Sequence, residues 1–412
     1  MDSPVLERFL RYVRYDTQSD ESSTTFPSTG KQLVLLRDLA AELRELGLTD
    51  AAIDEHGYVM ATIPATSKKA GVPAIGFIAH VDTSPDMPGA DVKPIVHRAY
   101  DGRDLVLPDD PSAILRLAEL PELAAVIGHD IVTASGTTLL GGDDKAGVAA
   151  IVTAAAHLMA RPEILHGPVR IAFTPDEEIG RGTLHFDVAR FGARYAYTLD
   201  GGGRGEIETE SFSADAMTVT FHGFNTHPGY GKGRLVNAIK VAAAFIDALP
   251  SHGLSPETTD GRDGYVHPYL VDASVDRTTV KVLIRDFENA RLIEKEALLE
   301  RLAREAAARY PGSRAEIAVA ESYRNMKEIL DRHPHVGAHA REAITRAGLE
   351  IRDTLIRGGT DGSRLSFMGL PTPNLSAGEH TFHSRLEWVS VQEMEMAVRV
   401  IVELCGVWEQ RS

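Results

Sequence analysis

Histidine and carboxylate side chains recur at particular places in this 412-residue chain, either directly after short apolar runs or before a long apolar stretch. The recurring groups are His80, Asp82, Asp143, Glu177, Glu178, Asp200 and His383. Imidazole nitrogen and carboxylate oxygen are ligands of zinc, and catalytic zinc sites keep one coordination position for water. Two such ions can share a carboxylate, so one bridging carboxylate plus one histidine and one carboxylate per ion would suffice. The sequence therefore predicts a two-metal hydrolytic centre.

Two acidic residues remain once five ligands are counted. Asp82 lies two residues after His80 and suits the role of accepting a hydrogen bond from the second ring nitrogen of a metal-bound histidine. Glu177 lies beside Glu178 and suits a general base that takes a proton from water. Chemistry alone leaves two choices open, between the adjacent Asp143 and Asp144, and between His380 and His383.

Apolar segments must position these groups. Residues 74–79, 169–173 and 195–199 are typical of buried parallel strands, and each is followed by candidate groups. In α/β enzymes the chemistry lies just beyond the carboxyl ends of such strands. Gly141 and Gly142 precede the acidic pair, and a small apolar helical pattern follows it. The Pro-, Asp- and Gly-rich residues 84–130 predict a surface excursion with a helix near 111–118.

The pattern changes near residue 212, where apolar and polar residues alternate as in a half-exposed strand. The order strand, helix, strand, strand, helix, strand that follows is typical of a ferredoxin-like module. The earlier α/β pattern returns after about residue 325. We therefore expect a discontinuous α/β catalytic domain, residues 1–211 and 325–412, interrupted by an inserted α+β module at 212–324.

Composition limits the class of protein and its partners. The contents of 43% hydrophobic and 25% charged residues are those of a globular protein. The net charge of −16 argues against a nucleic-acid or anionic-membrane partner. The N-terminus lacks the features of a signal peptide, and no apolar run is long enough to span a bilayer. The single cysteine, Cys405, cannot form an internal disulfide, which favours a cytoplasmic location.

Several motifs resemble those of the peptidase T family, the tripeptide aminopeptidase branch of the co-catalytic zinc peptidases related to carboxypeptidase G2 and aminoacylase. The motifs, which extend over nearly the whole chain, are Tyr15-Asp-Thr-Gln18, His80-Val-Asp-Thr-Ser-Pro-Asp86, Gly142-Asp-Asp-Lys-Ala-Gly147, Phe173-Thr-Pro-Asp-Glu-Glu-Ile-Gly180, Thr198-Leu-Asp-Gly-Gly202, Asn225-Thr-His-Pro-Gly229, Ser255-Pro-Glu-Thr-Thr-Asp260, Ile284-Arg-Asp-Phe287 and Ile356-Arg-Gly-Gly-Thr-Asp-Gly362. Two of the strings, Thr-Pro-Asp-Glu-Glu and Ser-Pro-Glu-Thr-Thr, favour this branch over dipeptidases and deacylases.

The resemblance implies a role for each candidate. Asp143 would bridge two zinc ions, with His80 and Asp200 completing one site and Glu178 and His383 the other. Glu177 would be the general base, and Asp82 would orient His80. The family usually has a cis peptide bond after the bridging aspartate, which here is Asp143–Asp144. Alignment through Phe-His-Ser-Arg favours His383 over His380.

The resemblance also makes residues 212–324 a lid that often serves for dimerisation, so a homodimer through the lid is expected. His227 would reach a carbonyl oxygen of the substrate. Arg285 and Arg357 would bind its carboxylate, for which a planar guanidinium is well shaped.

The expected activity is removal of the N-terminal residue from tripeptides, with Asp176 as a candidate acceptor of the free N-terminus. The alternatives are a dipeptidase or N-acyl amino acid deacylase on the same scaffold, and a non-catalytic anion-binding module. For the last, the loop 358–363 could cradle a phosphate, although it lacks the Gly-Lys-Ser/Thr ending of a P-loop.

Overall fold

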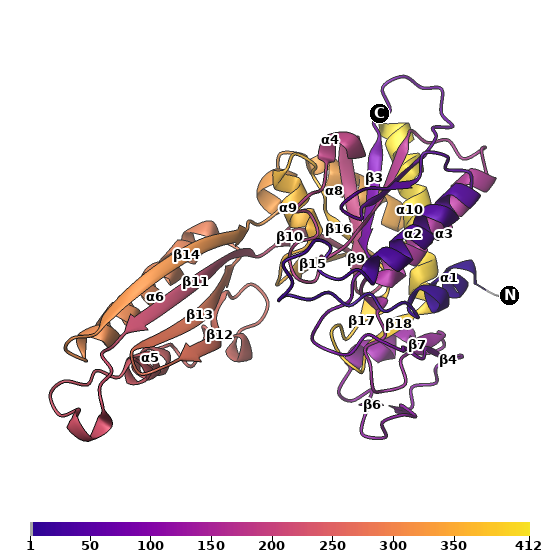
Figure 1. The fold of residues 1–412 in the computed structure, drawn as a ribbon. Helices are drawn as coiled ribbons and strands as arrows, with labels where there is room; N and C mark the ends of the chain where they lie inside the picture. The colour runs from indigo at the N-terminus through magenta and orange to yellow at the C-terminus, as the bar shows by residue number, and fades with distance from the viewer. Residues whose placement is uncertain (1–2) are drawn as a thin grey trace. The chain divides into compact units, whose positions relative to one another are not determined.

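The computed structural model describes residues 3–412, and the chain divides into two compact units (Figure 1). Unit 1 holds the chain up to Thr209 together with Met326–Thr354 and Thr360–Ser412, and unit 2 holds Glu210–Asn325 and Leu355–Gly359. The sequence placed residues 355–359 in the catalytic domain. They belong to unit 2 because, for example, the Ile356 carbonyl accepts the Phe212 N–H at 2.9 Å.

Unit 1 is built on a mixed eight-stranded sheet. In spatial order its strands are β1 (Ala52–Ile53), β2 (Val59–Ile63), β8 (Val169–Thr174), β3 (Ile75–His80), β9 (Tyr195–Gly201), β16 (Asn374–Ser376), β10 (Glu206–Ser211) and β15 (Arg352–Ile356). Strand β3 pairs in parallel with β8 and β9, and β9 pairs in parallel with β16. The carboxyl ends of these four strands therefore meet at one edge of the sheet.

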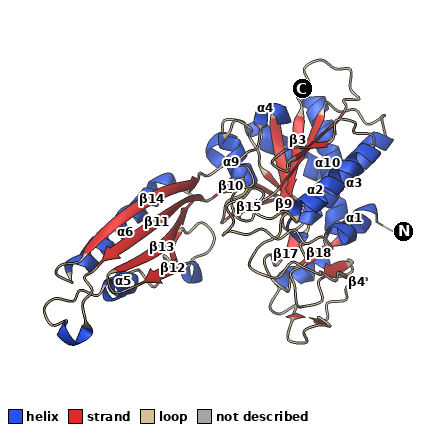
Figure 2. Ribbon diagram, viewed as in Figure 1, coloured by secondary structure: helices blue, strands red, loops and turns tan. Residues whose placement is uncertain are grey.

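Helices cover both faces of this sheet (Figure 2). The larger apolar cluster contains residues of α1 (Pro4–Tyr12), α2 (Gln32–Glu45), α3 (Gly142–Ala160), α8 (Pro334–Arg346) and α10 (Val391–Arg411). The other face carries residues of α9 (Asp361–Phe367) and Phe191 of α4 (Val188–Phe191). Within β3, Phe77 packs into the first cluster and Ile78 into the second, which is why this strand is apolar at consecutive positions.

Short strands occur within residues 84–130, which the sequence assigned to a surface excursion, and one of them joins a sheet with strands from outside this region. A four-stranded sheet has the order β17 (Glu379–His380), β18 (Trp388–Ser390), β7 (Ile131–Thr133) and β4 (Ile95–His97). A pair, β5 (Leu105–Val106) and β6 (Ile114–Leu115), and a 3₁₀ helix, η1 (Pro121–Val126), complete it. The helix expected near 111–118 is wrong. Asp110 instead accepts the Ser112 N–H at 2.9 Å in a local turn, and Leu115 packs in a small cluster with Trp388.

Unit 2 has the ferredoxin-like order of elements that the sequence predicts. The elements are β11 (Ser213–His222), η2 (Pro228–Tyr230), α5 (Ala238–Asp247), η3 (Pro256–Thr258), β12 (Tyr265–Ala273), β13 (Arg277–Asp286), α6 (Asn289–Ala308) and β14 (Arg314–Tyr323). The strands form an antiparallel sheet in the order β12-β13-β11-β14, and both helices share one apolar cluster with it. Alternate residues of β13, including Val280 and Val282, are buried, so this sheet has one covered face.

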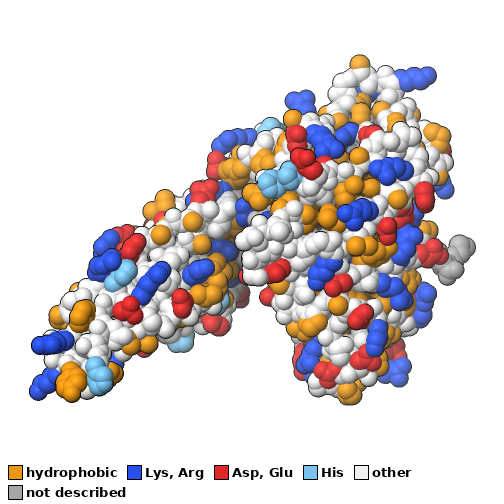
Figure 3. All heavy atoms as spheres, in the orientation of Figure 1, with side chains coloured by type: hydrophobic (Ala, Val, Ile, Leu, Met, Phe, Trp, Pro, Cys, Tyr) orange, Lys and Arg blue, Asp and Glu red, His pale blue; other side chains and the backbone are white. Residues whose placement is uncertain are grey.

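The short helix α7 (Lys327–Leu330) leads back into unit 1. On the face drawn in Figure 3, basic and acidic side chains are interspersed. Among residues 3–412, no helix combines the length and apolarity needed to cross a bilayer.

Candidate metal centre

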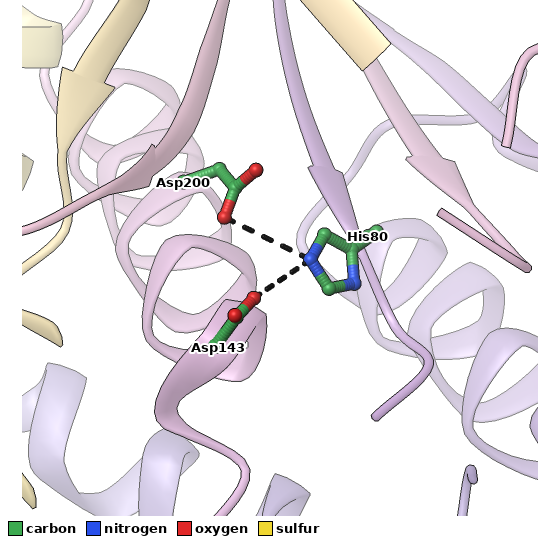
Figure 4. Close-up of side chains that lie close together, drawn as sticks. All are labelled: His80, Asp143 and Asp200. Carbon is green, nitrogen blue, oxygen red and sulfur yellow. Dashed lines mark hydrogen bonds and ion pairs between the residues drawn. The ribbon is translucent and has the colours of Figure 1, made fainter. Parts of the chain in front are cut away.

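His80 closes strand β3, where only 3% of the residue is exposed, and it meets two carboxylates. Its Nε2 atom lies 2.9 Å from Oδ1 of Asp143 and 3.7 Å from Oδ1 of Asp200. The three side chains converge from three elements, the end of β3, the start of α3 and the end of β9 (Figure 4). Parallel pairing of β3 with β9 is what brings His80 and Asp200 to the same edge.

Asp143 lies in the turn that begins helix α3. The preceding Gly141 has a left-handed backbone with φ 80°, which glycine adopts without a steric penalty. The Asp143–Asp144 peptide bond is cis, as the resemblance implied. The two carboxylate oxygens of Asp143 face different imidazoles, because Oδ1 faces His80 and Oδ2 lies 3.4 Å from Nε2 of His383.

Glu178 and His383 form the other half of the centre. Oε2 of Glu178, in the loop after β8, lies 2.8 Å from Nε2 of His383. His383 and nearby Thr381 both have left-handed backbones, with φ 53° and 58°, so the loop between β17 and β18 bends sharply where the imidazole is presented. The ring nitrogen Nδ1 of His383 is 3.2 Å from Oδ2 of Asp86.

The side chains thus fall into two groups that share Asp143. In each group, His80–Asp143–Asp200 and Asp143–Glu178–His383, the ligand atoms lie within 4.8 Å of one another. Burial, reinforced by Asp143, raises the pKa of Asp200 to about 7 and that of Glu178 to about 8. The buried carboxylates repel one another, and each group includes an imidazole, which binds a metal in its neutral form. This set of ligands fits two divalent cations.

Asp82 connects the two halves. It is completely buried, and Nδ1 of His80 lies 3.1 Å from the backbone carbonyl oxygen of Asp82 and 3.4 Å from its Oδ1. The same carboxylate accepts the backbone N–H groups of Glu177 at 3.0 Å and Glu178 at 3.2 Å. Asp82 therefore fixes both the ring of His80 and the loop that carries the two glutamates.

Glu177 offers a carboxylate next to this centre. Burial raises its pKa well above the ordinary value, and the nearby Asp361 and Asp200 carboxylates add to the rise, while His80 opposes it. A carboxylate with a raised pKa holds a proton more readily than an exposed glutamate does. A general base needs this property, because it must keep the proton that it has taken from water until it passes the proton on.

Glu387 is a residue that the sequence reasoning missed. Its buried carboxylate accepts the backbone N–H groups of Leu140 at 2.7 Å, Gly141 at 2.9 Å and Asp143 at 3.0 Å. It therefore holds the turn that presents Asp143. The only signal in the sequence is its place four residues after His383.

The structure distinguishes Asp143 from Asp144. Oδ2 of Asp144 accepts the backbone N–H of His80 at 3.0 Å, and its Oδ1 accepts that of Gly147 at 3.1 Å. Asp144 also forms a histidine-free group with Asp200 and Glu379, a second residue that the sequence reasoning missed. Burial raises the pKa of Glu379 well above its ordinary value.

His380, the other histidine of the C-terminal motif, has different neighbours. Its Nε2 lies 2.8 Å from Oε2 of Glu393, and its ring stacks on Trp388 at a centroid distance of 3.8 Å. Among the described residues, it belongs to none of the groups that could hold a metal.

Asp176, the candidate acceptor of a substrate N-terminus, is wrong for that role. It is completely buried, and its carboxylate oxygens accept hydrogen bonds from Ser28 N–H at 2.5 Å, Ser28 Oγ at 2.5 Å and Gln32 Nε2 at 2.6 Å. These contacts hold the loop 16–31 against the strand end and leave the carboxylate no open side.

The candidate substrate-binding residues all lie in unit 2. His227 is exposed in the loop between β11 and α5. The guanidinium of Arg285 lies over the ring of Tyr323 at 5.3 Å, and Arg357 donates to the Gly261 carbonyl at 2.7 Å.

Known proteins resemble this chain over its whole length. A curated protein named peptidase T from Geobacillus kaustophilus is 47% identical over 412 residues, all of both chains. Two solved structures share the fold over nearly all of both chains. They are aminopeptidase PepT from Bacillus cereus (23% identity, TM-score 0.75, 98% of each chain) and a tripeptidase from Staphylococcus aureus (21% identity, TM-score 0.76, 99% of this chain and 98% of that one). The model of peptidase family M20/M25/M40 matches residues 138–406. The chain therefore belongs to peptidase family M20/M25/M40.

Proposed function

We propose that this protein is a zinc-dependent aminopeptidase that removes the N-terminal residue from tripeptides. The observation that carries the proposal is the placement of Asp143, whose two oxygens face the imidazoles of His80 and His383. Relatives named peptidase T and structural neighbours named aminopeptidase and tripeptidase support this substrate class over dipeptides and acylated amino acids.

Five side chains would hold two zinc ions. His80, Asp143 and Asp200 would hold one, and Asp143, Glu178 and His383 the other. Histidine ligands favour zinc over magnesium or calcium, which prefer all-oxygen sites. When bound, the two ions would polarise the substrate carbonyl and make water acidic enough to be deprotonated near neutral pH.

Glu177 moves the proton in the proposed reaction. Its carboxylate takes a proton from the attacking water as the new C–O bond forms at the scissile carbonyl. It then delivers that proton to the peptide nitrogen as the C–N bond breaks, so the shortened peptide leaves as a neutral amine. Asp82, 3.4 Å from Nδ1 of His80, keeps that ring oriented with Nε2 toward Asp143.

Unit 2 would recognise the substrate. We assign His227 to a carbonyl oxygen and Arg285 and Arg357 to the C-terminal carboxylate, which a guanidinium binds in a fork.

Unit 2 would act as a lid and take part in a homodimer. Its edge strand β12 exposes Tyr269, Leu270 and Val271. Leu270→Lys should turn a dimer into a monomer in light scattering; an unchanged mass, or a monomeric native protein, would contradict this arrangement.

Substrate assays combined with metal analysis test the proposed activity. We expect about two zinc ions per chain and cleavage of a free tripeptide at its first peptide bond. The N-acetylated tripeptide, a dipeptide and an N-acetyl amino acid should be poor substrates. Preference for the acetylated compounds would indicate a deacylase, and metal-free protein without turnover would indicate a binding module.

We also place the enzyme in the cytoplasm, since its one cysteine is a buried thiol.

A further inference from the structure

Three histidines gather at the amino-terminal end of β9, the strand whose other end carries Asp200. His333 and His335 lie near Tyr195, the first residue of β9, with ring centroids 5.8 Å and 4.8 Å from the tyrosine ring. His339 packs edge-on against Trp408 at 4.4 Å. The five residue-to-residue steps from Tyr195 to Asp200 span about 16 Å at the rise of a strand, so this cluster is separate from the candidate metal centre.

The spacing of two of these histidines is that of a chelating pair. His335 and His339 lie four residues apart on helix α8, so their side chains project from the same face. Their ring centroids are 5.9 Å apart with an interplanar angle of 66°. With metal–nitrogen bonds of about 2 Å, two imidazoles on one ion have centroids about 5 Å apart, so a shared ion requires these two rings to move closer than the 5.9 Å seen here. His333 lies 6.1 Å from His335, but among the described residues no group of three ligand atoms within 4.8 Å of one another includes these histidines, so the pair alone is the candidate site.

The protonation states also suit a metal. Burial, with the neighbouring His333 and Arg194, lowers the pKa of His335. Burial and His335 lower the pKa of His339, whose Nδ1 is buried without a hydrogen-bond partner. Both rings are therefore neutral at pH 7, which is the form of histidine that binds metal ions.

Another pair of histidines in unit 1 shows what a purely packed arrangement looks like. His56 and His185 stack face to face at 4.2 Å with an interplanar angle of 10°. A ring nitrogen binds a metal in the plane of its ring, so nitrogens of two parallel stacked rings cannot converge on one ion. The two pairs are a natural contrast within the same chain.

We propose that the pair His335 and His339 forms a second metal site for a transition-metal ion that prefers nitrogen ligands, such as Ni²⁺ or Cu²⁺. Such ions bind imidazole strongly, and two histidines at this helical spacing form a chelate. This site is independent of the activity proposed above, because none of its side chains belongs to the groups that contain Asp143.

Metal titration of the zinc-loaded enzyme tests the site. Ni²⁺ is titrated by calorimetry into the wild type and a double variant, His335→Ala with His339→Phe. The phenylalanine keeps the ring contact with Trp408 but removes the nitrogen ligands. We expect the double variant to lose one equivalent of bound Ni²⁺. The control variant His56→Ala with His185→Ala should retain that equivalent.

Electron paramagnetic resonance of one added equivalent of Cu²⁺ gives an independent readout. Hyperfine splitting from nitrogen should appear in the wild type and in His56→Ala/His185→Ala, and it should be absent from the His335/His339 variant. Tripeptide turnover and circular dichroism of each variant verify folding, and His335→Gln alone replaces the double variant if that one does not fold. Equal Ni²⁺ stoichiometry and equal Cu²⁺ spectra in wild type and the folded variant would overturn the proposal.

Discussion

The two ends of strand β9 differ in chemistry although they belong to one buried strand. At the carboxyl end Asp200 joins His80 and Asp143 in a cluster of ionisable groups. At the amino end Tyr195 stacks on Trp408 with centroids 5.0 Å apart, and histidine rings surround them. The carboxyl end keeps buried carboxylates close together at an electrostatic cost, whereas the amino end packs aromatic rings against one another, and burial of their apolar surface is favourable.

Because the two ends of β9 differ in this way, we expect substitutions at one end to affect activity and substitutions at the other to affect stability. Changes at the carboxyl end should alter turnover strongly, because Asp200, His80 and Asp143 belong to the candidate metal centre. Changes at the amino end should alter the free energy of unfolding and leave turnover unaffected.

Chelation of divalent metal should abolish peptidase activity, because the carboxyl end would lose both cations that Asp143 and its neighbours are proposed to hold. Activity after dialysis against a chelator, and again after zinc is restored, measures this. The far-ultraviolet circular dichroism spectrum serves as the control for folding. Full activity in protein shown to contain no metal would contradict the proposal that the carboxyl end of β9 needs bound metal for turnover.

The chelated protein should also become less stable as pH rises. Asp200 and Glu178 have folded pKa values of about 7 and 8, above those of an unfolded chain, near 4. Between pH 5 and 9 the folded state therefore binds more protons than the unfolded state, and its stability falls with pH. His383, with its pKa raised to about 11, acts in the same direction above pH 6.5. Melting temperatures of the metal-free protein should fall over this range, and a flat profile would contradict the assignment.

Replacement of Glu177, the proposed general base, should be the most damaging single change. Glu177→Gln keeps the shape of the side chain but cannot take a proton, so kcat should fall about 100- to 10,000-fold. Metal content and melting temperature should stay near those of the wild type, because Glu177 is not among the five candidate ligands. Near-normal kcat in this variant would remove Glu177 from the mechanism.

Glu387→Gln should have an intermediate effect on both kcat and the free energy of unfolding. The amide has one oxygen to offer where the carboxylate accepts three backbone N–H groups around Asp143. We expect a loss of about 1–3 kcal/mol in stability and a lower kcat, since the turn loosens. Urea unfolding and steady-state kinetics measure the two effects. Glu393→Gln, a buried carboxylate that contacts His380, is the matched control and should affect kcat less.

Trp408→Phe at the amino end should change stability alone. The indole Nε1–H donates to the Tyr197 hydroxyl at 2.9 Å, and the hydroxyl itself donates to the Val336 carbonyl at 3.0 Å. Phenylalanine keeps much of the ring contact but removes the first bond, so unfolding should become easier by about 1–2 kcal/mol. A change in kcat larger than twofold would mean that the two ends of β9 are coupled.

Much of this fold could be predicted because the local pattern is strong. Apolar runs that end in polar residues marked β3, β8 and β9, and alternation marked the strands of unit 2. Both patterns follow from which faces of a strand are buried. His80 and Asp200 could be expected at one sheet edge for the same reason. The false helix near 111–118 shows the limit, since the Asp110 turn and the contact of Leu115 with Trp388 outweighed the local pattern.

The sequence by itself determined the strands that carry the candidate site, the order of elements in unit 2 and the residue types at the strand ends, since periodicity and motif spacing are local properties. Only the tertiary structure decided that Glu387 holds the turn of Asp143, that Asp176 is sealed by Ser28 and Gln32, and that residues 355–359 join unit 2. It also decided that His56 stacks on His185 and that His80 and His383 both face Asp143. Hydrogen bonds and ring contacts between residues far apart in the chain depend on how the sheet brings them together, and no local pattern records that.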